Sequence, residues 1–128
     1  MAYRSFEDLD VWKRGFRIAV RIYEVLKDCR DYGLKDQMTR SAVSIASNIS
    51  KGAERDSLAE YIRFLHIAKG SAAELRTQVY IAQQIGVISH EIKNELIKEL
   101  KIISSMLHAL IKSLKLKSFI KTCQKLLS

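Results

Sequence analysis

Residues 56–86, DSLAEYIRFLHIAKGSAAELRTQVYIAQQIG, contain the pattern that decides the fold. Their apolar and small side chains recur at alternating intervals of three and four residues, as on one face of a helix that packs lengthwise on another helix. These positions are Leu58, Tyr61, Leu65, Ala68, Ala72, Leu75, Val79, Ala82 and Gly86. Ser57 and Glu60 resemble a capping box, and Gly86 is placed to end the helix in a left-handed conformation. At ~1.5 Å per residue this helix is about 43 Å long and needs similarly long neighbours.

The composition indicates one all-α domain. Of the 128 residues 48% are hydrophobic, which is enough to bury a core without metals or disulfides. The chain has no proline and only five glycines, so little interrupts long helices. Cys29 and Cys123 lack metal-ligand spacing, as is typical of reduced cysteines in a cytoplasmic protein. There is no signal-peptide core and no apolar run of the ~20 residues that span a bilayer, and we therefore expect no membrane partner.

The same intervals predict three more helices. The first follows a capping-box pattern at Ser5 and Asp8 and extends to the region of Cys29, the second begins at Leu34, and the fourth begins after Ser89. Their predicted core positions are Leu9, Trp12, Phe16, Ala19, Tyr23 and Leu26, then Met38, Ala42, Ile45 and Ile49, and finally Leu96, Leu100, Ile103, Leu107, Leu110 and Leu114. The loops are short, so consecutive helices must be antiparallel neighbours.

We therefore predict an all-α fold, an antiparallel up-down-up-down four-helix bundle, over residues 1–115. Residues 116–128 are predicted to be a basic C-terminal extension of the fourth helix or a frayed tail. A basic surface-binding helix is the remaining alternative for this segment.

The formal net charge of +8 is concentrated at the C-terminus. Residues 112–128 contain no acid and hold Lys112, Lys115, Lys117, Lys121 and Lys125, which leaves a charge of only +3 for the rest of the chain. The total charge is therefore a weak argument for a nucleic-acid partner. On the first helix a basic stripe consists of Lys13, Arg14, Arg17 and Arg21. A solvated face is one explanation of this stripe, and a phosphate-binding face is the other.

Small polar residues form a second stripe on the second helix. It consists of Gln37, Ser41, Ser44, Asn48, Lys51 and Arg55. Serine and asparagine are poor choices for a merely solvated helix face, so we expect close packing there against another subunit, another helix or a ligand. Of these we prefer another subunit, and the predicted oligomer interface contains Ser41, Ser44 and Asn48.

Antiparallel pairing of the second and third helices places Arg40 near Gly70 and Glu74. A partly buried arginine needs an acceptor, and Glu74 is the acid within a turn of the expected position. We therefore predict a structural ion pair between Arg40 and Glu74. A glycine inside a helix costs ~1 kcal/mol relative to alanine, so Gly70 predicts the close approach of another backbone.

The sequence lacks the motifs of the common enzyme and metal sites. No Glu-x-x-His pair suits a carboxylate-bridged metal centre, and His66, His90 and His108 share no helical turn. There is no glycine-rich phosphate loop, no G-x-S-x-G and no Cys-x-x-Cys. We expect no catalytic residues, no metal and no cofactor.

Residues 37–89 closely resemble the four-helix bundle proteins encoded in intervening sequences of bacterial large-subunit ribosomal RNA genes. That family also includes the accessory variability protein of diversity-generating retroelements. The resemblance covers about residues 6–111, with one departure at Ser50-Lys51, where the family usually has Ala-Glu. Its strongest pieces are Gln37 to Arg40, Ser44 to Ile49, Gly52 with Arg55, and Phe64 to Gln78.

The resemblance implies a closed bundle assembled as a homopentamer. In the retroelement relative it implies the binding of nucleic acid and a reverse transcriptase through basic surfaces. RNA or DNA and a reverse transcriptase are therefore the partners that the resemblance suggests for this chain.

Together these features predict a non-enzymatic oligomeric protein that binds nucleic acid. Phosphate contacts are predicted for Arg14, Arg17, Arg21, Arg40, Arg55 and Arg63. Assembly into a ring would combine these modest basic patches into a stronger field. The alternative is a protein–protein interaction scaffold with no nucleic-acid role.

Overall fold

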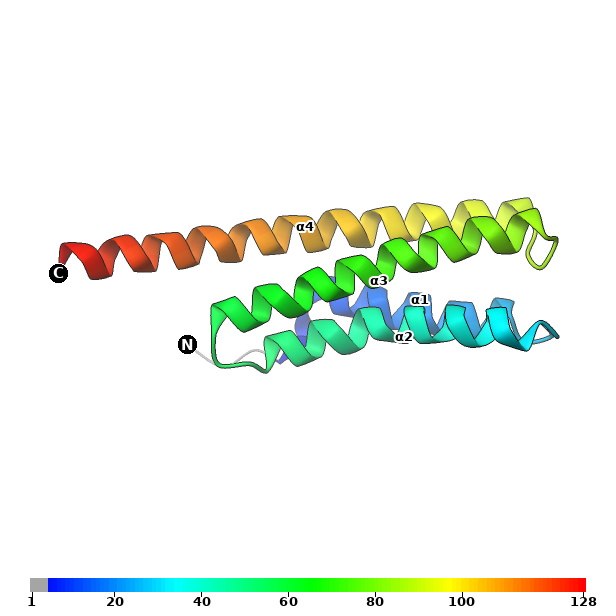
Figure 1. Cartoon of the computed structure of the whole chain (residues 1–128), viewed down its shortest axis with the longest axis horizontal. Coiled ribbons are helices and arrows are strands. Elements are labelled where there is room, and N and C mark those ends of the chain that lie inside the picture. The colour runs from blue at the N-terminus through cyan, green and yellow to red at the C-terminus, as the bar shows by residue number, and fades with distance from the viewer. Residues whose placement is uncertain (1–4) are drawn as a thin grey trace.

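The computed structural model of the chain describes residues 5–128, and in this range it contains helices and no strand. A short 3-10 helix, η1 (Phe6–Asp8), precedes α1 (Asp10–Val25), α2 (Tyr32–Ala53), α3 (Leu58–Gln84) and α4 (His90–Leu127). The four α-helices run alternately in opposite directions and pack side by side, and α4 is the longest (Figure 1). The predicted all-α, up-down-up-down four-helix bundle is confirmed.

The predicted helix ends of α3 and α4 are confirmed. The Ser57 hydroxyl accepts a hydrogen bond from the Glu60 amide at 3.1 Å, and the Ser89 hydroxyl accepts one from the Ile92 amide at 3.1 Å. Gly86 has a φ of 80°, the left-handed conformation that a glycine adopts without strain. The first helix differs: Ser5 caps η1 by accepting from the Glu7 amide, and α1 starts only at Asp10.

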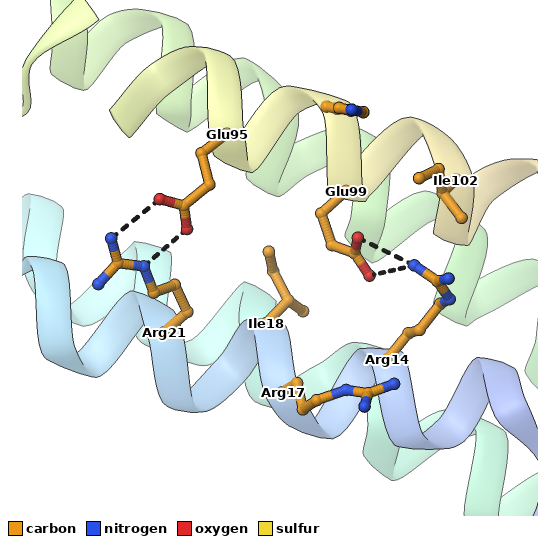
Figure 2. A pocket seen from close by; sticks show the side chains of 8 residues that line it. Arg14, Arg17, Ile18, Arg21, Glu95, Glu99 and Ile102 are labelled. Carbon is orange, nitrogen blue, oxygen red and sulfur yellow. Dashed lines mark hydrogen bonds and ion pairs between the residues drawn. The ribbon is translucent and has the colours of Figure 1, made fainter. Parts of the chain in front are cut away.

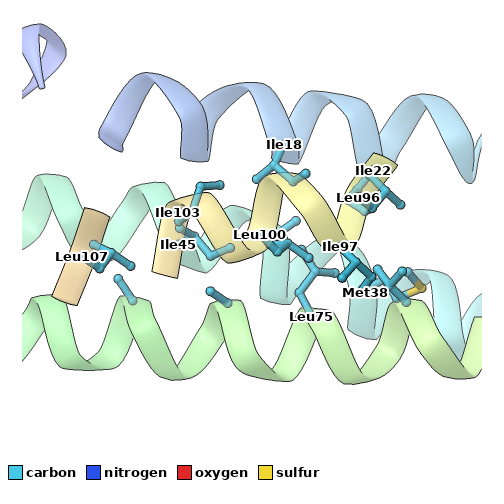
Figure 3. Packing of buried hydrophobic residues seen from close by; sticks show 14 of the residues in the cluster. Ile18, Ile22, Met38, Ile45, Leu75, Leu96, Ile97, Leu100, Ile103 and Leu107 are labelled. Carbon is cyan, nitrogen blue, oxygen red and sulfur yellow. The ribbon is translucent and has the colours of Figure 1, made fainter. Parts of the chain in front are cut away.

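The core runs along the axis of the bundle and is built by aliphatic side chains from all four helices (Figure 3). Every predicted core position of α2 is fully buried, as are Leu65, Leu75 and Val79 of α3. In α4 the predicted stripe is buried except for the partly buried Leu110, beside which Ile111 fills the core. The three-and-four spacing was therefore sufficient to predict the core faces of these three helices.

Helix α1 faces the core mainly with a different stripe from the predicted one, although the predicted Leu26 just after α1 is fully buried and Leu9, Trp12 and Ala19 pack against the core. Its buried residues are Val11, Gly15, Ile18 and Ile22. Phe16 and Tyr23 are 51% and 53% exposed, so their assignment to the core was wrong. Both stripes have helical spacing, but Gly15 selects the aliphatic one because it lets α2 approach: a Cβ atom at Gly15 would lie 3.3 Å from Ile45 Cγ2.

Two helical glycines of α2 and α3 have opposite surroundings. A Cβ atom at Gly52 would lie 2.9 Å from Phe64 Cβ and 3.1 Å from the Tyr61 carbonyl oxygen, so α3 packs directly on this position. At Gly70 nothing lies within 4 Å of such an atom. The prediction that Gly70 admits another backbone is therefore wrong within the subunit, and Gly52 has that role instead.

Helix α4 continues to Leu127 and projects beyond the start of α3 (Figure 1). Its last buried residue is Leu114. The segment that follows is helical and stands away from the other three helices. In the part of the chain that the structure describes, no helix combines the length and hydropathy needed to cross a membrane.

Candidate nucleic-acid interface

The three predicted arginines of α1 lie together on one side of the bundle. The contact between α1 and α4 is the least extensive of the contacts between neighbouring α-helices, and it leaves an open groove of about 710 Å³. The residues that line this groove are Arg14, Arg17, Ile18, Arg21, Glu95, Lys98, Glu99 and Ile102. Four cations and two carboxylates thus face each other above an aliphatic floor.

Arg21 and Glu95 form the shortest ion pair across the groove (Figure 2). Arg21 donates from Nε to Glu95 Oε2 at 2.7 Å and from Nη2 to Glu95 Oε1 at 2.9 Å. This paired arrangement holds the guanidinium in a fixed plane. The hydrogen bond to Arg21 lowers the pKa of Glu95 below its ordinary value, and the hydrogen bond to Glu95 raises the pKa of Arg21.

Arg14 and Glu99 form a second ion pair, on the same two helices. Arg14 donates from Nη1 to both carboxylate oxygens of Glu99, at 2.9 and 3.0 Å. Both side chains are about two-thirds buried, with exposed fractions of 35% and 30%. Because only Nη1 is used, the Nε and Nη2 donors of Arg14 are available to another anion.

Arg17 lies between these two pairs along α1 and is exposed (Figure 2). Among residues 5–128 no carboxylate lies within ion-pair distance of Arg17, and the same holds for Lys98 on the opposite wall. The groove thus contains two cations held by carboxylates and two cations without this compensation.

The other predicted phosphate contacts lie elsewhere. Arg55 and Arg63 stand near the α2–α3 turn, where their guanidinium carbons lie 4.9 and 4.5 Å from the centre of the Phe64 ring. Arg63 also pairs with Glu60 at 3.1 Å. The structure therefore groups Arg14, Arg17 and Arg21 and separates them from Arg55 and Arg63.

The predicted Arg40–Glu74 ion pair is wrong. Arg40 is 79% exposed and donates from Nε to Asp36, one turn earlier on α2, at 2.9 Å. Glu74 is also exposed and accepts a hydrogen bond from Gln78 at 3.4 Å. The physical reason is angular: Arg40 follows the buried Met38 by two residues, which turns it about 200° around the helix and away from α3.

The small polar stripe of α2 is also used within the subunit. Ser44 and Ser71 of α3 are joined by a hydrogen bond of 2.8 Å between their Oγ atoms. Asn48 donates to the carbonyl and the hydroxyl oxygen of Ser44, at 2.8 and 2.9 Å. Ser41 and Asn48 are 5% and 8% exposed. The close packing predicted here is present between two helices of the same chain, and the assignment of Ser41, Ser44 and Asn48 to an oligomer interface stays a prediction.

A second groove, between α1 and α2, is apolar and has a volume of about 420 Å³. Its lining includes Phe6, Trp12, Phe16, Val20, Tyr23 and Val43. Val20 is 46% exposed and Val43 is 42% exposed. Trp12, Phe16 and Tyr23, which were predicted to face the core, thus form one wall of this groove.

Comparison with known proteins identifies the family of the chain. The model of the 23S rRNA-intervening sequence protein family matches residues 7–109. The chain belongs to this family. A comparison with curated proteins gives no match.

A solved structure of similar shape comes from Bacteroides thetaiotaomicron and is described as a protein with unknown function from the S23 ribosomal protein family. It shares 26% sequence identity with the chain, has a TM-score of 0.75, and the match covers 80% of this chain and 98% of that one. The suspected resemblance to the ribosomal intervening-sequence family is therefore confirmed.

The sequence interpretation missed the contribution of α4 to the charged groove. Glu95 and Glu99 are one helical turn apart, and Lys98 lies between them. This spacing was a usable signal, because in an antiparallel pair such carboxylates face arginines at similar intervals on the neighbouring helix. In residues 5–128 no group of three histidine, cysteine or acidic side chains is arranged to hold a metal ion.

Proposed function

We propose that this member of the intervening-sequence protein family is a non-enzymatic, cytoplasmic, oligomeric bundle that binds RNA or DNA through the α1–α4 groove. The observation that carries the proposal is the placement of Arg17 between Arg14 and Arg21, with Lys98 on the facing wall. Phosphate groups need cationic donors on an open surface, and this groove supplies them from two helices.

The two ion pairs support this role because they orient the arginines in advance. A guanidinium held by a carboxylate keeps less side-chain freedom, so less entropy is lost when a phosphate binds its remaining donors. The carboxylates also limit the affinity, since they compete with phosphate for Arg14 and Arg21. The groove of one subunit is therefore suited to modest binding, and several grooves in one oligomer would strengthen it.

The decisive experiment measures binding of mixed-sequence RNA and DNA oligonucleotides between 50 and 200 mM salt. Phosphate neutralisation releases counterions, so affinity should fall steeply, with a slope of about 0.7 per phosphate contact on single strands and about 0.9 on duplex DNA. Absence of binding at 50 mM salt would exclude the proposal.

Substitutions identify the groove as the binding surface. We expect Arg17→Gln and Lys98→Gln each to lower both the affinity and the salt slope, because each removes an uncompensated cation. Arg30→Gln is the matched control, since Arg30 is exposed but lies in the α1–α2 loop outside the groove. An equal loss with Arg30→Gln would mean that only the total charge matters.

The alternative function is a protein–protein interaction scaffold. The observation that favours it is the apolar groove between α1 and α2, where Phe16 and Tyr23 remain half exposed in the monomer. Exposed aromatic groups beside a groove are typical of protein contact surfaces. A second copy of the chain is the partner that we propose, and five copies is the number that the family resemblance implies. If a second copy binds at this groove and the protein binds no nucleic acid, the scaffold function alone is favoured.

A further inference from the structure

Helix α4 reverses its apolar and polar faces where it leaves the bundle. Up to Leu114 its buried side chains follow one stripe with intervals of three and four residues. The same stripe continues beyond Leu114 through Ser118, Lys121 and Lys125. The side of the helix that faces the core is therefore cationic in the extension.

The solvent side of α4 makes the opposite change. Within the bundle it carries the exposed residues Lys98, Lys101, Ser105, His108 and Lys112. The same three-and-four spacing then continues through Leu116, Phe119, Cys123 and Leu126. Leu116 is 59% exposed, Phe119 is 66% exposed and Leu126 is 81% exposed. Ile120 and Leu127 flank this stripe and are 47% and 89% exposed.

This apolar stripe has no partner within the chain. No residue after Leu114 is buried, and α4 extends past the ends of the neighbouring helices (Figure 1). A simple overrun of the core pattern would have kept the apolar residues on the bundle side. The reversal instead directs them outward, together with the lysines on the solvent side of α4.

The charge of the segment restricts what can cover it. No acidic residue follows Glu99, and residues 112–127 contain five lysines. Pairing of two such helices would bring like charges together, which opposes self-association. Nucleic acid would satisfy the lysines but would leave the leucine, isoleucine and phenylalanine side chains in water. An anionic lipid surface satisfies both groups at once.

We propose that residues 112–127 of α4 bind the surface of an anionic phospholipid bilayer. The stripe of Leu116 and Phe119 enters the boundary between head groups and acyl chains, and Lys112 and Lys115 beside it contact lipid phosphates. The lysines on the opposite side of the helix add electrostatic attraction to the anionic surface. Lys98, Lys101 and Lys112 lie on the same side of α4 and add positive charge along the edge that faces the flat surface. The expectation of no membrane partner was based on the lack of a spanning run, and a helix that lies in the interface needs none.

The test uses the full-length chain and two kinds of vesicle, one of phosphatidylcholine alone and one that also contains phosphatidylglycerol. We expect co-sedimentation with the anionic vesicles, weakened by salt, and little with the neutral ones. Phe119→Ser with Ile120→Ser should weaken binding roughly tenfold or more by removing apolar contact. Lys117→Gln with Lys121→Gln and Lys125→Gln should do the same by removing charge.

The control is a triple variant, Lys13→Gln with Lys27→Gln and Lys51→Gln, which loses the same charge from exposed positions of the bundle and its α1–α2 loop. Its vesicle binding should change much less than that of the extension variants, and circular dichroism should show all variants folded. Failure to bind anionic vesicles, or binding that survives Phe119→Ser with Ile120→Ser, would overturn the proposal. If the chain does not bind vesicles and the extension lysine variant loses RNA binding, the segment binds nucleic acid instead. If the chain does not bind vesicles and the variant with Phe119→Ser and Ile120→Ser has a smaller mass in light scattering than the parent, the segment contacts another copy of the chain.

Discussion

The hydroxyl oxygens of Ser44 and Ser71 lie 2.8 Å apart and join the middle of α2 to α3. Ser44 also accepts a hydrogen bond from the buried Asn48, so one small side chain connects two helices and satisfies an amide. A larger residue would hold the helices apart, and an apolar one would leave Asn48 with one acceptor fewer.

This arrangement predicts unequal effects of two serine substitutions. Ser44→Ala should lower the free energy of unfolding by more than Ser71→Ala, because it also removes an acceptor of Asn48. We expect a loss of about 0.5–1.5 kcal/mol for each hydrogen bond, measured by urea unfolding. Ser105→Ala on the exposed side of α4 corrects for the helix propensity that alanine adds. If Ser44→Ala leaves the stability unchanged but alters the mass of the oligomer, the small polar stripe of α2 belongs to the oligomer interface instead.

The Arg21–Glu95 pair predicts a small pH-dependent term in stability. Because its pKa is lowered in the folded state, Glu95 contributes stability above its ordinary value of 4.5, and this contribution is lost as the pH falls through the folded value. The side chains are 37% and 47% exposed, so the contribution should stay below about 1 kcal/mol.

Glu95→Gln should therefore be slightly destabilising at neutral pH, and its difference in stability from the parent protein should shrink in urea unfolding as the pH falls below 4.5. In the Arg21→Gln variant, the pKa of the Glu95 carboxyl group, measured by NMR titration, should rise toward 4.5. If the pKa of Glu95 is the same in this variant as in the parent protein, Arg21 is not the cause of the lowered pKa.

Gly52 and Gly70 predict opposite outcomes for the same substitution. Gly52→Ala should destabilise the bundle by about 1–3 kcal/mol, because its new Cβ meets Phe64 and the Tyr61 backbone. Gly70→Ala should stabilise it by about 0.5–1 kcal/mol, because that position is open and alanine favours the helix. Thermal unfolding should separate the two variants by several degrees, and equal melting temperatures would contradict the packing at Gly52.

The periodic pattern was sufficient to predict most of the fold but only part of the candidate site. Spacing specifies which residues share a face, and in α2, α3 and α4 one face was clearly apolar. Helix α1 has two apolar stripes, and the choice between Ile18 and Phe16 depends on how closely α2 packs at Gly15, which spacing does not encode. Arg40 was misplaced because the angle of a side chain around its helix matters as much as its height along the bundle.

The charged groove predicts that removal of a carboxylate strengthens nucleic-acid binding. Glu99→Gln frees Arg14 and leaves one acid fewer in the groove, so RNA affinity at low salt should increase. If Arg14 and Glu99 were only a structural pair, the substitution would lower stability slightly and leave binding unchanged. Glu91→Gln is the matched control, because Glu91 is exposed on α4, lies outside the groove lining and pairs with none of its arginines.

The apolar groove between α1 and α2 predicts where a second copy binds. Phe16 and Tyr23 expose about half of their surface there, so burying the exposed part stabilises an interface by roughly half of the value for a fully exposed side chain, or about 1 kcal/mol each. Phe16→Ser with Tyr23→Ser should therefore dissociate the oligomer with little loss of subunit stability, because neither residue belongs to the core.

Light scattering over micromolar concentrations measures this effect directly. We expect a mass several times 14.7 kDa for the parent chain and a mass near 14.7 kDa for the double variant. Ile85→Ser is the control, since Ile85 is 57% exposed just after α3 and is not part of the lining of this groove. A closed ring needs two different faces of each subunit, so the groove should meet a surface other than itself. A parent chain that remains monomeric would exclude the oligomer, and an oligomer that persists in the double variant would move the interface to another face.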